Sequence, residues 1–143
     1  MYDINYLAVL IAAIAFFVVG ALWYNDALFG KVWRASMGKT DAEFEKDRAN
    51  TNMAKSFGLM FFSSLLMAYV TAHLVDLMAV VYPEAGKISL GLMTGFWIWL
   101  GYIASYVLTA IAFEDRPWKY YFINTGYWLI GALMMGVILN VWK

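Results

Sequence analysis

The stretch INYLAVLIAAIAFFVVGALWYN, from Ile4 to Asn25, contains no charged side chain. A helix that crosses a bilayer needs about 20 apolar residues in a row. The stretch is long enough for this, so we interpret it as a membrane span. A secretory signal peptide would have basic residues before the apolar run and a small-x-small cleavage site after it. The sequence has neither feature, so we expect the segment to be retained.

Three further stretches, 56–82, 88–113 and 120–142, are apolar over a comparable length. The whole chain is 64% hydrophobic and 14% charged, whereas about 25% of the residues in a soluble domain are charged. We therefore predict an all-α fold, a transmembrane four-helix bundle that forms one membrane domain over residues 1–143. The expected spans are 4–25, 56–82, 88–113 and 120–142.

Composition also excludes several classes of function. The formal net charge is zero, which argues against nucleic-acid binding because phosphate contacts require a basic surface. The chain has no cysteine, so disulfides, thiolate metal sites and cysteine nucleophiles are absent. One histidine with one nearby aspartate supplies too few ligands for a metal. We expect the lipid bilayer as the main partner, and no metal or other cofactor.

The basic residues predict the orientation. Segment 26–55 holds six lysines and arginines, and the turn before the last span holds Arg116 and Lys119. The opposite side holds only Lys87 and Lys143. Because Lys and Arg accumulate in cytoplasmic loops, we expect segment 26–55 in the cytoplasm and both termini outside. The expected location is a bacterial plasma (inner) membrane.

Segment 26–55 carries its own helical pattern. Five apolar residues between 28 and 37 share one face, which predicts an amphipathic helix lying in the cytoplasmic interface of the membrane. We expect Asp26 to cap its start and Gly38 to end it in the left-handed conformation. Thr40 and Glu43 then form a capping box for a second, charged helix. The apolar residues are Leu28, Phe29, Val32, Trp33 and Met37.

Ionisable residues inside a span are expensive and usually face a bundle interior or a water-filled cavity. Tyr69, His73 and Asp76 follow one another at i, i+4 and i+7, on one face of the second span. They are candidates to line a ligand site or a pathway, where a His–Asp pair could relay protons. The structural alternative is that they only hydrogen-bond a neighbouring helix.

Four other residues are candidates for a cytoplasmic entrance. Glu114 and Arg116 belong to the turn between the third and fourth spans, and Asn124 and Tyr127 belong to the start of the fourth. The turn can bind a charged headgroup or substrate, or it can be a hairpin whose charges neutralise one another, since exposed ion pairs contribute little.

Small residues spaced four apart predict close helix packing, within the bundle or between subunits. The pairs are Ala8 with Ala12, Gly91 with Gly95, Gly101 with Ser105, and Ala132 with Gly136.

The exits of the first and third spans are alike. ALWYNDALFGKVW and AIAFEDRPWKYYF both run from aliphatic to aromatic residues, then to acidic, basic and aromatic ones. The two spans run in the same direction, so a parallel two-plus-two hairpin repeat is a further hypothesis. In transporters, such repeats place binding sites at the repeat interface.

Two motifs carry a family resemblance. Gly20-Ala-Leu-Trp-Tyr followed by Leu28-Phe-Gly-Lys-Val-Trp33 is similar to the signature of the DUF1761 family of small bacterial membrane proteins. FEDRPWKYYFINTGY and the closing GALMMGVILNVW resemble the third and fourth spans of that family. Asn25-Asp26 departs from the Ser-Pro type of pair expected there. The resemblance implies a four-span multi-pass membrane fold and no established activity.

Three functions fit these observations. The first is a homo-oligomer that binds or conducts a small solute or lipid. The second is an accessory subunit of a larger membrane complex, with Trp97, Trp99 and Trp128 as contact surface. The third is a membrane enzyme that uses His73 as a base, for which spacing supplies no second catalytic group. We assign no catalytic residue and do not expect an enzyme.

Overall fold

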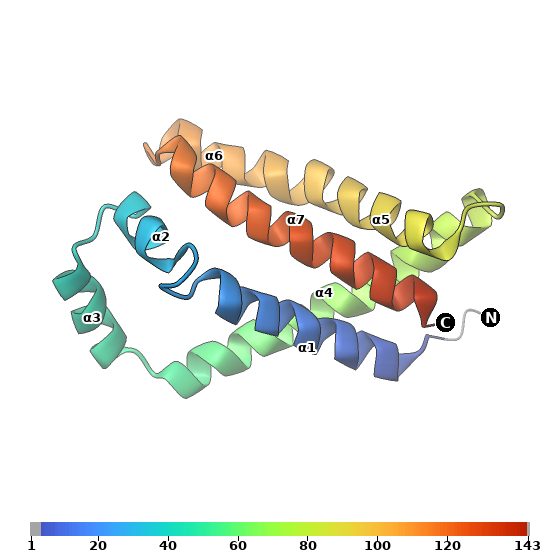
Figure 1. The fold of residues 1–143 in the computed structure, drawn as a ribbon, viewed down its shortest axis with the longest axis horizontal. Helices are drawn as coiled ribbons and strands as arrows, with labels where there is room; N and C mark the ends of the chain where they lie inside the picture. Colours follow the sequence, from blue (N-terminus) through green and yellow to red (C-terminus); the bar gives the residue numbers. More distant parts are fainter. Residues whose placement is uncertain (1–3, 143) are drawn as a thin grey trace.

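A computed structural model describes residues 4–142, and every regular element in this range is helical (Figure 1). Four helical stretches are long and apolar enough to cross a membrane: α1, α4, the continuous stretch Lys87–Phe113, and α7. The predicted all-α bundle is thus confirmed. The elements are α1 (Tyr6–Trp23), α2 (Gly30–Ser36), α3 (Asp41–Asn50), α4 (Met53–Val81), α5 (Lys87–Ile98), a π-helical segment (Trp99–Ala104), α6 (Ser105–Phe113) and α7 (Trp118–Val141).

The spans form two hairpins. α1 packs on α4, and α5 packs along α7, while α7 also contacts α1 and α4 and so joins the two pairs. Figure 1 shows α5, α6 and α7 running side by side, with α4 crossing α1 obliquely. α2 and α3 lie beyond the ends of the spans, on the same side as the turn between α6 and α7. This hairpin arrangement accommodates a two-plus-two repeat, which itself stays a hypothesis.

Small side chains on α1 let the first hairpin and α7 approach closely. Ala12 and Ala13 are fully buried, as are Ala68 of α4 and Met135 of α7. Phe16 fills the remaining space, with its ring against Gly131, where an added Cβ would overlap it. Because lipid is as apolar as these side chains, van der Waals packing rather than hydrophobicity holds such a core together.

Glycines bring α5 and α7 into backbone contact. A Cβ added to Gly91 would lie 2.5 Å from the carbonyl oxygen of Gly136, and one added to Gly95 would overlap the backbone of Ala132. Two of the predicted small-residue pairs therefore pack on each other within one chain. Residues 8 and 12 are buried in the core, whereas 101 and 105 stay exposed.

The third span contains a π-helical segment at its middle. Such segments are rare, and often occur at functional sites. Here Trp99 turns inward, and its indole nitrogen donates a hydrogen bond to the carbonyl oxygen of Thr125 at 2.7 Å. Tyr102 and Tyr106, by contrast, are 78% and 73% exposed. The second half of the third span thus faces outward, and it contacts α7 less extensively than α5 does.

Candidate functional site

The seven residues singled out from the sequence do not form one site. Three lie on the second half of α4, and the other four lie at the opposite end of the bundle, around the start of α7 (Figure 1). The first group is Tyr69, His73 and Asp76, and the second is Glu114, Arg116, Asn124 and Tyr127.

The α4 group points away from the core. Tyr69 and His73 are both exposed. Their rings meet edge to face, with the ring centres 4.7 Å apart. Among residues 4–142 neither the Tyr69 hydroxyl nor the His73 imidazole has a hydrogen-bond partner. Asp76 is half-buried and has an interaction of its own. The described residues contain no cluster of His, Asp and Glu side chains able to hold a metal ion.

Arg116 fastens the turn between α6 and α7. Its Nε lies 3.3 Å from a carboxylate oxygen of Glu114, and its Nη1 donates to the carbonyl oxygen of Met37 at 3.1 Å. The guanidinium also lies 5.5 Å from the ring centre of Tyr120. Each of these contacts joins protein to protein, which is the pattern of a structural hairpin linked to the end of α2.

Asn124 and Tyr127 belong to the interior contact between α1 and α7. The Oδ1 of Asn124 accepts a hydrogen bond from the Tyr24 hydroxyl at 2.9 Å. Tyr127 is 6% exposed, and its hydroxyl donates to the carbonyl oxygen of Phe16 at 3.5 Å. A Cβ added to Gly20 would lie 2.9 Å from that hydroxyl. The glycine is what allows the tyrosine to lie across α1.

The Gly20–Trp33 stretch folds into an aromatic cluster at this end of the bundle. Trp23 donates from its indole nitrogen to the carbonyl oxygen of Ile123 at 3.0 Å, and its ring lies 4.4 Å from that of Phe29. The ring centres of Tyr24 and Trp33 lie 5.1 Å apart. The indole nitrogen of Trp33 is buried and has no partner in the described part of the chain, so ring contacts hold this side chain. We call Trp23, Tyr24, Phe29 and Trp33 the exit cluster.

The prediction that Asp26 caps the interfacial helix is wrong. The cap residue of α2 is Phe29, which makes no side-chain bond, and α2 is shorter than the predicted interfacial helix. Asp26 instead pairs with Arg34 at 2.5 Å. The hydrogen bond from Arg34 lowers the pKa of the Asp26 carboxyl, which is therefore ionised at neutral pH. Gly38 has φ of 72°, as predicted.

The capping box is confirmed. The Thr40 side chain accepts a hydrogen bond from the Glu43 amide, while the Glu43 carboxylate accepts one from the Thr40 amide at 2.9 Å. These bonds lower the pKa of the Glu43 carboxyl, the bond from the backbone amide contributing most. The charged helix α3 is therefore a well-capped element, although it buries no residue.

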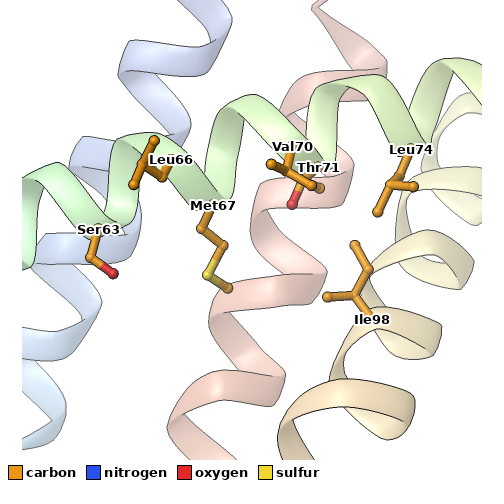
Figure 2. A pocket seen from close by; sticks show the side chains of 7 residues that line it. All are labelled: Ser63, Leu66, Met67, Val70, Thr71, Leu74 and Ile98. Carbon is orange, nitrogen blue, oxygen red and sulfur yellow. The ribbon is translucent and has the colours of Figure 1, made fainter.

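Within residues 4–142, a groove between α4 and α5 has the shape of a ligand site. Its volume is about 370 Å³. Figure 2 shows Met67 and Thr71 of α4 on one side and Ile98 of α5 on the other, directed toward the same space. All the lining side chains are apolar except two hydroxyls. The lining consists of Ser63, Leu66, Met67, Val70, Thr71, Leu74 and Ile98.

Sequence reasoning did not find this groove, because its two walls come from different spans. On α4 the lining residues follow i, i+3, i+4 and i+7 from Ser63, which marks one helix face. That signal is the same as the one for a face covered by a neighbouring helix. Only the oblique course of α4 leaves the face open here.

Four helical stretches that are long and apolar enough to cross a membrane, small-residue helix contacts and apolar outward faces place this molecule in the class of helical membrane proteins. Within that class, the chain belongs to the DUF1761 family. The family model, described as a protein of unknown function, matches residues 7–140. No curated protein and no solved structure matches the chain.

Proposed function

We propose that this protein binds a membrane lipid, with an acyl chain of the lipid lying in the groove between α4 and α5. The observation that carries the proposal is the groove itself, which opens on the membrane-spanning part of the molecule and has an almost entirely apolar lining. Small-molecule sites have volumes of about 300–1,000 Å³ and combine apolar walls with a few polar groups. A volume of about 370 Å³ with two hydroxyls lies at the lower end of that range.

Binding is better supported than conduction. The contact between α1, α4 and α7 is filled by side chains, with Ala12, Ala68, Val75 and Met135 all 0% exposed. A pathway for a polar solute needs polar groups along its length. Among the described residues, the outward-facing Tyr69 and His73 do not line such an interior path.

The alternatives have less support. An accessory subunit would present Trp97, Trp99 and Trp128, but only Trp97, 57% exposed, is free to contact a partner. The Trp99 indole donates a hydrogen bond to α7, and the ring centre of Trp128 lies 5.1 Å from that of Phe16. A base at His73 would need an oriented second group, whereas among the described residues no side chain forms a hydrogen bond with this imidazole, whose ring lies against that of Tyr69. We therefore favour binding over catalysis.

A tryptophan at position 70 should displace the lipid. Val70 lines the groove and is 54% exposed, so a larger side chain fills the space without disturbing the core. We expect Val70→Trp to reduce the phospholipid retained per chain after purification in mild detergent by about tenfold, equivalent to about 1.4 kcal/mol. Native mass spectrometry measures this ratio.

The matched control is Val81→Trp. Val81 is on the same helix, is 64% exposed and lies outside the groove. Equal lipid retention by the two variants would rule out the groove as the binding site.

We also propose that segment 26–55 lies in the cytoplasm of a bacterium, with both termini outside the plasma membrane. The hydrogen bond from Arg116 to Met37 keeps the two basic loops on one side of the bundle. This supports the orientation, because Lys and Arg accumulate in cytoplasmic loops. In intact cells, a membrane-impermeant thiol reagent should label Ala85→Cys and leave Lys46→Cys unlabelled. The reverse pattern contradicts this orientation.

A further inference from the structure

Two polar side chains of α4, Tyr69 and His73, lie on its outer face and have no hydrogen-bond partner among the residues that the structure describes. Tyr69 is 41% exposed and His73 is exposed beside it, while the buried side of the helix is formed by Ser64, Ala68 and Val75. Within residues 4–142, the rings of these two residues contact each other and no other ring.

Their depth makes this exposure significant. α4 has 29 residues with Met67 at its centre, so at 1.5 Å per residue His73 lies about 9 Å along the axis from the midpoint. The hydrocarbon core extends about 15 Å to either side of its own midplane. Both side chains therefore belong to the hydrocarbon region if the helix spans it centrally. Ionisable groups at such depth almost always pair with one another or face a protected interior.

The surrounding residues form a seam with the spacing of a helix–helix contact. Exposed or half-buried side chains recur alternately four and three residues apart, which is the 3.5-residue period of two helices crossing in a left-handed pair. Apolar residues occupy both ends of the seam and polar ones its middle. The seam consists of Phe62, Leu66, Tyr69, His73, Asp76 and Val80.

We propose that this seam is the contact between two copies of the chain, which meet as a parallel pair through α4. In such a pair, a two-fold axis along the membrane normal brings each residue to its own equivalent at the same depth. A hydroxyl and an imidazole supply both donors and acceptors, so Tyr69 and His73 of one copy are complementary to the same two residues of the other. A different partner would have to supply its own polar group at this depth. The inference is independent of lipid binding in the groove, although Leu66 borders both.

Cysteines at the ends of the seam test this contact without altering its polar middle. The chain has no native cysteine, so Val80→Cys introduces a single thiol. We expect oxidation in native membranes to convert most of this variant into a disulfide-linked dimer. Ile88→Cys, at the same end of the bundle on α5 and 61% exposed, is the control and should remain monomeric. Equal cross-linking of the two variants, or none in either, would overturn the proposal.

A second substitution tests the role of the imidazole. Adding His73→Leu to Val80→Cys should lower the cross-linked fraction by about threefold to tenfold at limiting protein density, as expected for the loss of interhelical hydrogen bonds in a membrane. An unchanged fraction would exclude His73 from the contact. Lipid retention by the double variant should equal that of Val80→Cys alone, which separates this result from a failure of the groove.

Discussion

Replacing Gly95 by leucine should force α5 away from α7 and strongly destabilise the folded chain. A side chain at this position overlaps the backbone of Ala132, which cannot move aside as a flexible side chain does. Overpacking a core commonly costs about 1–3 kcal/mol and sometimes more. Because two helix backbones must separate here, we expect a loss of about 3 kcal/mol or more. Unfolding of the detergent-solubilised protein by denaturant, followed by tryptophan fluorescence, measures the loss.

Gly101→Leu is the control for this prediction. Gly101 belongs to the same span, and no atom lies within 4 Å of a Cβ added there. The control should therefore unfold within about 1 kcal/mol of the parent, the size expected for a substitution away from packed contacts. If the two leucine variants are equally stable, α5 and α7 are not in backbone contact at this point.

Gly30→Ala should open the exit cluster. An added Cβ would lie 2.5 Å from the carbonyl oxygen of Tyr24 and 2.8 Å from the carbonyl carbon of Asn25, both parts of the backbone. The turn that returns Phe29 to Trp23 must then widen, at a cost of about 1–3 kcal/mol. Because this opening is local, the initial rate of tryptic cleavage within residues 26–55 should rise about tenfold.

The control for the turn is Gly58→Ala, near the start of α4. Nothing lies within 4 Å of a Cβ added at this position. Alanine also favours a helix over glycine by about 1 kcal/mol, so cleavage of the segment should be no faster than in the parent. A Gly30→Ala variant that is cleaved at the parental rate would show that the turn tolerates a side chain.

The sequence predicted those features whose cause is local. The four spans follow from apolar length, the capping box from Thr40 and Glu43, and the end of α2 from Gly38. The spacing of Gly91 and Gly95 also predicted that they pack closely against another helix. It did not indicate whether that helix belongs to the same chain or to another subunit. Local pattern fixes what an element is, and leaves open which face meets which neighbour.

The features that the sequence did not reveal depend on residues far apart in the chain. Trp23 and Ile123 are separated by 100 positions, as are Tyr24 and Asn124. These contacts gather the aromatic side chains at the end of the first span into a folded cluster. The same reasoning applies to Asp26. From the local sequence we predicted that it caps a helix, whereas in the structure its side chain pairs with Arg34, eight residues further along the chain.

The exit cluster also gives a physical reason for the motif that carries the family resemblance. Gly20 makes room for Tyr127, Trp23 bonds to α7, and Gly30 permits the tight turn that returns Phe29 and Trp33 to the cluster. An ordinary exit from a membrane requires none of these. The motif is therefore explained by packing at the end of the bundle, without a ligand.

The most direct test of lipid binding is to map where an acyl chain touches the protein. A phospholipid with a diazirine in the middle of one chain is added to the purified protein, activated by light, and located by mass spectrometry of peptides. We predict labelling concentrated on the groove residues Met67, Val70, Leu74 and Ile98, and its loss from them in Val70→Trp. Labelling spread evenly over outward-facing residues such as Leu7, Leu22 and Val81 would contradict the proposal.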